Sequence, residues 1–97
     1  MKISIIGFGD MGKIHSRIEK KLGYLSSIVE IDDNKRKNAS ELFNVPVYKN
    51  IEDMMHKETP NGIIIAVPSA DHFSVVEEII DLRTSSLKAI AIEKPVT

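Results

Sequence analysis

Three glycines near the start of the chain, at positions 7, 9 and 12, constrain its fold more than any other feature. They follow directly on the run 3–6, which is apolar at three of its four positions and suits a strand buried on both faces. Beyond them, apolar residues recur at the spacing of one helical face up to Gly23, at Met11, Ile14, Ile18 and Leu22. The segment is therefore predicted to form a strand, a tight turn and a helix.

The rest of the chain repeats this alternation of short apolar runs and amphipathic stretches. Further strands are predicted at 25–31, 45–48, 63–67 and 87–92. Helices are predicted at 35–43, around 51–55, and after Ser69, which can cap a helix with Phe73, Val76, Ile79 and Ile80 on one face. This pattern is typical of the α/β class, here a doubly wound parallel sheet of the Rossmann type spanning residues 1–97.

Composition and charge exclude several classes of partner. The 97 residues suffice for one domain, and with 42% hydrophobic and 28% charged residues they should pack a core. The 13 basic and 14 acidic side chains nearly cancel, so neither nucleic acid nor an anionic membrane is expected as a partner. The chain has no cysteine, its three histidines are dispersed, and no run reaches the length of a membrane span. We expect a soluble, cytoplasmic domain without a metal site.

The turn Gly7-Phe8-Gly9-Asp10-Met11-Gly12 has both the spacing and the context of a dinucleotide-binding motif, because it joins a strand to a helix. Gly7 would allow the tight turn, Gly9 a close approach of a diphosphate, and Gly12 close packing of the helix on the strand. The free N–H groups at the helix start would then hold the diphosphate, with Asp10 pointing to solvent. The alternative is that the glycines only make a tight connection.

Asp32 is the candidate for binding the ribose of such a cofactor. It lies 20 positions beyond Gly12, at the predicted end of the second strand, where a carboxylate can accept both ribose hydroxyls. This favours NAD over NADP, although NADP stays possible because basic residues follow at 35–37. The alternative is that Asp32 and Asp33 cap the next helix, with Asp33 as the preferred cap.

Three motifs together resemble a known family. They are the glycine turn with its continuation Lys13-Ile14-His15, the segment Pro68-Ser69-Ala70-Asp71-His72, and the closing Glu93-Lys94-Pro95. In this order, each at the end of a predicted strand, they are similar to the glucose-fructose oxidoreductase, inositol dehydrogenase and rhizopine catabolism family (Gfo/Idh/MocA). The resemblance implies an NAD(P)-dependent dehydrogenase that moves a hydride between nicotinamide and a hydroxyl-bearing carbon of a sugar, cyclitol or related compound.

The resemblance also assigns roles at the nicotinamide end of the cofactor. The lysine of the family's Glu-Lys-Pro motif lies beside nicotinamide and substrate, which makes Lys94 the candidate catalytic residue, with Lys94-Pro95 a candidate cis peptide. Glu93 is expected to point away from Lys94 and to be structural, although it belongs to the same cofactor-binding segment. Pro68 and His72 are expected near the nicotinamide, with His72 equally readable as an ordinary helix residue.

The chain also departs from the family. Members carry a second, larger α/β domain that provides the substrate pocket and the main oligomer contacts, and the sequence stops just after Lys94. We therefore expect a fragment that is inactive alone, from a parent that forms homo-oligomers. One rival interpretation is a non-enzymatic module that senses the nicotinamide redox state, and another is a truncated domain that self-associates through its last strand.

Overall fold

The computed structural model describes residues 1–93, and within that range the chain forms five strands, four α-helices and a short 3-10 helix. In chain order these are β1 (Ile3–Ile6), α1 (Asp10–Leu22), β2 (Leu25–Val29), α2 (Asp33–Phe43), β3 (Val47–Tyr48), α3 (Ile51–Glu58), β4 (Gly62–Ile65), η1 (Ser69–Asp71), α4 (His72–Leu82) and β5 (Ala89–Ile92).

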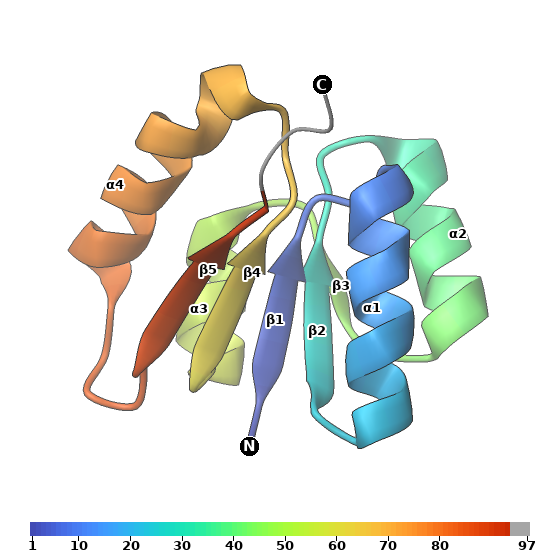
Figure 1. Ribbon diagram of the computed structural model, residues 1–97, viewed down its shortest axis with the longest axis horizontal. Coiled ribbons are helices and arrows are strands. Elements are labelled where there is room, and N and C mark those ends of the chain that lie inside the picture. Colours follow the sequence, from blue (N-terminus) through green and yellow to red (C-terminus); the bar gives the residue numbers. More distant parts are fainter. Residues whose placement is uncertain (94–97) are drawn as a thin grey trace.

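The five strands form one parallel sheet in the order β3-β2-β1-β4-β5. The chain moves outward from β1 to β3 and then returns to the other side of β1, so the direction of winding reverses there (Figure 1). In open α/β sheets, the crevice at the carboxyl ends of the strands beside such a reversal is where ligands bind. The predicted doubly wound parallel sheet is confirmed.

Helices cover both faces of this sheet. α1 and α2 lie together on one face, and α3 and α4 lie together on the other (Figure 1). Because successive side chains of a strand point to opposite faces, Ile5 and Ile6 of β1 enter two different cores. The core under α2 contains Ile5, Phe8, Ile28, Ala39 and Phe43. The core under α3 and α4 contains Ile6, Val29, Ile51, Met54, Met55, Ile63, Ile65 and Ile79.

Two central strands end earlier than their apolar runs predict. β2 ends at Val29 although the run continues to Ile31, and β4 ends at Ile65 although the run continues to Val67. The reason is the length of β1, whose last residue, Ile6, pairs with both Val29 and Ile65. Beyond that level no central strand remains to pair with, so the apolar residues that follow form the rim of the crevice.

The caps of two helices also differ from the prediction. The Asp32 side chain accepts a hydrogen bond from the backbone N–H of Lys35 at 2.9 Å and caps α2, so the preference for Asp33 was wrong. Asp33 is instead the first helical residue. Ser69 does not cap α4, because the chain makes the 3-10 turn η1 there and α4 begins only at His72.

The apolar stripe of α1 does not face the sheet. Its buried residues are Gly12 and Ser16, whereas Ile14, Ile18 and Leu22 are 43 to 58% exposed. Small residues on the inner face bring the helix axis close to the sheet, and the larger apolar side chains then lie at its flank. In α4, Ile79 is buried as predicted, but Phe73 is 78% exposed.

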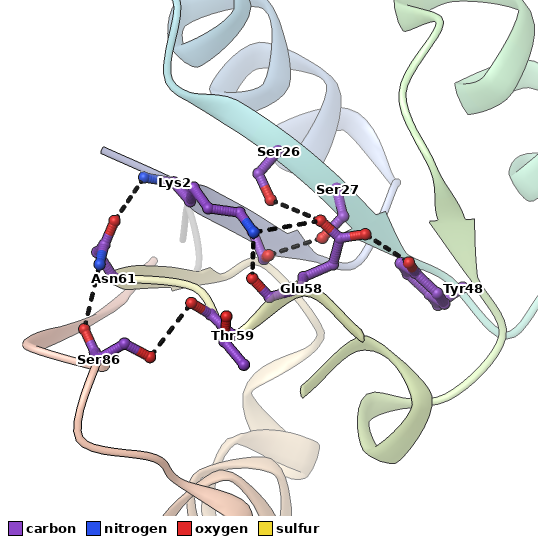
Figure 2. Close-up of polar contacts among 9 residues, drawn as sticks. Lys2, Ser26, Ser27, Tyr48, Glu58, Thr59, Asn61 and Ser86 are labelled. Atoms are coloured by element: carbon purple, nitrogen blue, oxygen red, sulfur yellow. Dashed lines mark hydrogen bonds and ion pairs between the residues drawn. The ribbon is translucent and has the colours of Figure 1, made fainter. Parts of the chain in front are cut away.

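A polar cluster holds the edge of the sheet opposite to the crevice, at the amino ends of the strands (Figure 2). At its centre, the Glu58 carboxylate at the end of α3 accepts hydrogen bonds from the Ser26 and Tyr48 hydroxyls, and the Lys2 ammonium donates to the Glu58 carbonyl. Burial and the hydrogen bond to Glu58 raise the pKa of Tyr48 to about 12. These side chains all have partners within the cluster, which indicates a structural role.

Two further findings concern membrane-spanning helices and metal-binding clusters. Within residues 1–93, no helix is both long and apolar enough to cross a membrane. In the same range, no three histidine, aspartate or glutamate side chains gather in a way that could hold a metal ion. The crevice at the carboxyl edge of the sheet is the candidate ligand site because the direction of winding reverses at β1.

Candidate functional site

A cavity of about 600 Å³ opens in this crevice and brings distant parts of the chain together. Its walls come from the glycine turn, the end of β2, the segment after β4 and the residue after β5. The lining residues are Gly7, Phe8, Gly9, Asp10, Met11, Glu30, Ile31, Asp32, Lys35, Ala66, Val67, Pro68, Ser69, Asp71 and Glu93. Eight of the residues that the sequence nominated for cofactor binding are in this set: Gly7, Phe8, Gly9, Asp10, Met11, Asp32, Pro68 and Glu93.

Two of the three glycines are required by the shape of the turn. Gly7 has φ of +101°, and a Cβ there would lie 2.6 Å from the carbonyl oxygen of Ala66. A Cβ on Gly12 would lie 2.0 Å from the carbonyl oxygen of Gly7, which is far inside van der Waals contact. These positions therefore make the tight turn and the close packing of α1 that the spacing predicts.

Gly9 has a different environment. A Cβ built on it would meet no heavy atom within 4 Å, so neither packing nor φ demands glycine at this position. The missing side chain leaves open space over the backbone, beside the start of α1. No side chain caps this helix within the described part of the chain, and its first intrahelical bond comes from the N–H of Lys13 to the carbonyl of Gly9. A diphosphate fits such a helix start, because the preceding N–H groups are unbonded donors at the positive end of the helix dipole.

Glu30 is a site residue that the sequence reasoning missed. Its side chain is buried, and its two carboxylate oxygens accept hydrogen bonds from different backbone N–H groups, Phe8 at 2.8 Å and Asp32 at 2.9 Å. It therefore ties the glycine turn to the start of α2. The available signal was a charged residue inside the otherwise apolar run 28–31, since a buried carboxylate requires partners.

The basic residues after β2 differ in whether their side chains could contact a ligand in the cavity. Arg36 donates to the carbonyl oxygens of Glu30 and Ile31 at 2.9 and 2.8 Å and also pairs with the Asp33 carboxylate. Its guanidinium is thus bound within its own loop. Lys35, by contrast, is exposed and lines the cavity beside Asp32. At the end of β2 the cavity is therefore lined by the carboxylates of Glu30 and Asp32 and by the side chain of Lys35.

The opposite end of the cavity is formed by the segments after β4 and β5. Glu93 continues the pairing of β5 with β4, its N–H donating to the carbonyl of Ile65 at 2.9 Å. Its carboxylate accepts a hydrogen bond from Nε2 of His15 in α1 at 2.7 Å. Pro68, in the segment after β4, also lines the cavity. His15 thus joins the helix of the glycine turn to the end of β5.

Two nominated residues, Gly12 and His72, are not among the lining residues, and a third, Lys94, is not among the described residues. Gly12 is buried on the inner face of α1, as its packing role requires. His72 is the first residue of α4, and its Nε2 donates to the Val67 carbonyl at 2.8 Å, so the ring holds the loop after β4 and is not among the lining residues. Lys94, and with it the Lys94-Pro95 peptide, lies outside the described residues.

A second cavity of about 320 Å³ adjoins the first on the face covered by α3 and α4. The two share Gly7, Glu30, Ile31, Val67 and Asp71 in their linings. The second cavity also has apolar walls, from Val29 and Val75 among others. The crevice therefore extends from the glycine turn over the end of β2 to the start of α3.

Comparison with protein families gives one match over residues 1–97, to the Gfo/Idh/MocA model, described as the oxidoreductase family with an NAD-binding Rossmann fold. No curated protein sequence matches the chain. The family match covers the glycine turn, the loop after β4 and the closing motif in a single alignment, as the resemblance of these motifs implies.

Solved structures agree with this match. The chain is 26% identical to myo-inositol 2-dehydrogenase from Lactobacillus plantarum, with a TM-score of 0.80, and 25% identical to scyllo-inositol dehydrogenase from Lactobacillus casei, with a TM-score of 0.79. At 19% identity it has the fold of the WlbA dehydrogenase from Bordetella pertussis, crystallised with NADH and UDP-GlcNAcA, with a TM-score of 0.84. Each comparison covers 98% of this chain but only 28% of the other.

The fold, the cavity at the point of strand reversal and the family match lead to one assignment. The sheet is wound as a dinucleotide-binding sheet is, and the glycine turn meets the geometric demands of that motif. The chain belongs to the Gfo/Idh/MocA oxidoreductase family and has that family's NAD-binding Rossmann fold.

Proposed function

We propose that residues 1–97 are the cofactor-binding domain of an oxidoreductase that transfers a hydride between a nicotinamide dinucleotide and a hydroxyl-bearing carbon of a sugar, cyclitol or related compound. The observation that carries this proposal is the 600 Å³ cavity, in which the open Gly9 stands between the end of β2 and Glu93. This arrangement fits a ligand with a diphosphate in its middle and a nucleoside on each side.

In this proposal the diphosphate lies against the start of α1, where the backbone N–H groups of residues 10–12 are available as donors. The adenosine ribose lies at the end of β2, where its hydroxyls donate hydrogen bonds to the carboxylates of Asp32 and Glu30. The adjoining cavity extends from that point and would take the adenine ring, whose flat apolar faces suit the walls from Val29 and Val75.

We propose NAD rather than NADP as the preferred cofactor. A 2′-phosphate at the end of β2 would face two carboxylates, Glu30 and Asp32, and electrostatic repulsion disfavours it. Arg36 is occupied by two carbonyls and Asp33, so it offers no free guanidinium for that phosphate. Among the described residues that line this cavity, Lys35 is the basic one, and a single ammonium group faces two carboxylates, so NADP would bind more weakly.

The nicotinamide would then lie over the ends of β4 and β5, between Pro68 and Glu93. When bound, it supplies hydride transfer. Lys94 follows Glu93 directly in the sequence, and we propose that its ammonium group donates a hydrogen bond to the reacting oxygen and assists its proton transfer.

The substrate side of the reaction needs further protein. The chain spans about 28% of the length of the inositol dehydrogenases to which it is similar. Hydride transfer requires donor and acceptor to be held in one water-poor site. We propose that residues 1–97 bind the cofactor, and that substrate binding and homo-oligomer contacts belong to additional polypeptide.

The proposal can be tested by titrating the purified chain with NADH and, separately, NADPH while following nicotinamide fluorescence. Gly9→Val places a branched side chain where the diphosphate would lie, and its Cβ would meet no heavy atom within 4 Å in the empty protein. Wild type should bind NADH more tightly than NADPH, and Gly9→Val should bind neither while keeping its circular dichroism spectrum. Equal NADH binding by wild type and Gly9→Val would contradict the proposed site.

A further inference from the structure

The His15–Glu93 pair fixes a carboxylate at one end of the cavity. The two residues are 78 positions apart, their side chains are 22% and 28% exposed, and His15 Nε2 donates to Glu93 Oε2 at 2.7 Å. The Glu93 backbone is held as well, through its bond to Ile65. A carboxylate anchored at both backbone and side chain keeps its position when a ligand enters the cavity.

The position of Glu93 relates it to one half of the cofactor. In the sheet order β3-β2-β1-β4-β5, the glycine turn follows the central strand, Asp32 lies on the β2 side, and Glu93 lies on the β5 side. If the diphosphate occupies the turn and adenosine the β2 side, as the proposed function has it, the nicotinamide half extends toward Glu93. The present inference rests on that proposed placement.

The two oxidation states of the cofactor differ in charge at that location. The nicotinamide ring of NAD⁺ carries a positive charge, whereas the dihydronicotinamide ring of NADH is neutral. Glu93 repels the diphosphate of both forms equally, so this repulsion cancels when their affinities are compared. Its attraction for the ring acts on NAD⁺ alone.

We propose that Glu93, held by His15, makes this cavity select the oxidised form of the nicotinamide cofactor. Glu93 is thus a specificity-determining residue for the oxidation state of the cofactor, and His15 is the residue that positions it. Two opposite unit charges about 6 Å apart, in a medium with an effective dielectric constant of about 40 to 80, attract each other enough to change an affinity about three- to tenfold, and this is the size of preference that we expect.

The other acidic residues of the cavity do not provide the same effect. Glu30 and Asp32 lie on the adenosine side, and Asp10 lies at the first turn of α1, next to the proposed diphosphate. Asp71 is on the β4 side, but it is exposed, and solvent screens its charge more strongly than that of the partly buried Glu93. Glu93 is the carboxylate in this part of the cavity that is both shielded and held by a side-chain partner.

Calorimetric titration of the folded chain with NAD⁺ and with NADH, at one pH and one ionic strength, gives the ratio of the two dissociation constants. Glu93→Gln has the same shape and removes the charge, and it should reduce the preference for NAD⁺ three- to tenfold. His15→Gln keeps a donor near the Nε2 position and should leave the ratio within twofold of wild type. The matched control is Glu41→Gln, which removes one charge from the exposed face of α2 and should leave the ratio unchanged.

A ratio within twofold of wild type in Glu93→Gln, with both nucleotides still bound, would overturn this inference and leave the proposed function intact. If Glu93→Gln does not fold by circular dichroism, Glu93→Ala removes the same charge and must shift the ratio in the same direction; no shift overturns the inference. Binding of neither nucleotide by wild type would overturn the proposed function and this inference with it.

Discussion

Replacing Glu30 should remove the hydrogen bonds that connect the glycine turn to the end of β2 and should destabilise the fold. The buried carboxylate accepts one backbone N–H from Phe8 and one from Asp32, and Glu30→Ala would leave both donors without a partner. Hydrogen bonds to a charged acceptor contribute about 1.5 to 3 kcal/mol each, so the loss in unfolding free energy should be about 3 to 6 kcal/mol. That is a large part of the roughly 5 to 15 kcal/mol typical of a whole domain.

Urea denaturation followed by circular dichroism measures this loss. With an m-value of about 2 kcal/mol/M, Glu30→Ala should lower the midpoint by about 2 M. Glu30→Gln keeps one acceptor oxygen but turns an amide group toward the other N–H, so it should lose about half as much. Glu41→Gln, on the exposed face of α2, is the control and should stay within about 0.5 kcal/mol of wild type. If Glu30→Ala lowers the free energy of unfolding by less than about 1 kcal/mol, Glu30 does not stabilise the glycine turn in this way.

Three other predictions follow from the fold and the site. Gly12→Ala pushes a Cβ to 2.0 Å from the Gly7 carbonyl, so α1 must shift and thermal unfolding should occur at least 10 °C lower; an unchanged midpoint would contradict the close packing. The Tyr48 phenol should ionise near pH 12 in the folded protein, and Glu58→Gln should lower that pKa, as ultraviolet difference spectroscopy would record. Because its folded pKa lies above the unfolded value of about 10, Tyr48 stabilises the fold fully below pH 10 and loses that contribution as the pH rises toward 12. The purified 97-residue chain should oxidise no polyol with NAD, and any turnover in a spectrophotometric assay at 340 nm would disprove the need for additional polypeptide.

Much of the fold could be predicted from local pattern, because helices and strands differ in the spacing of their apolar residues and are separated by glycine and proline. The run at 3–6 followed by the glycines defined the first β-α unit, and the proline and glycine at 60–62 separated α3 from β4. The ends of the strands were harder to predict from the sequence. The end of β2 at Val29 depends on where β1 stops pairing, which is a property of the neighbouring strand and not of the apolar run itself.

Predictions of burial failed where tertiary packing decides between faces. The period-3.6 pattern of α1 correctly indicated a helix, but its inner face is set by Gly12 and Ser16, which allow a closer approach than Ile14 or Ile18 would. In α4, Phe73 continues the apolar spacing, yet it is exposed in the first turn of the helix.

The sequence nominated candidate site residues where a motif is local, and it missed a residue whose role depends on partners elsewhere in the chain. The glycine spacing, together with its position between a predicted strand and a predicted helix, indicated the turn, and Asp32, Pro68 and Glu93 line the same cavity as that turn. The Glu30 carboxylate was missed because its partners are backbone N–H groups, which leave no mark in the sequence. The pairing of His15 with Glu93 spans 78 positions and emerges only from the fold.

The central claim is that a nicotinamide dinucleotide binds across the glycine turn. The most direct test is a titration of the ¹⁵N-labelled chain with NAD⁺, followed by the backbone amide signals. The largest shifts should fall on residues 9–12 at the start of α1, on Asp32 and on Glu93, at the two ends of the cavity. The absence of shifts at residues 9–12, or a maximum at the opposite edge of the sheet around Glu58, would contradict this account.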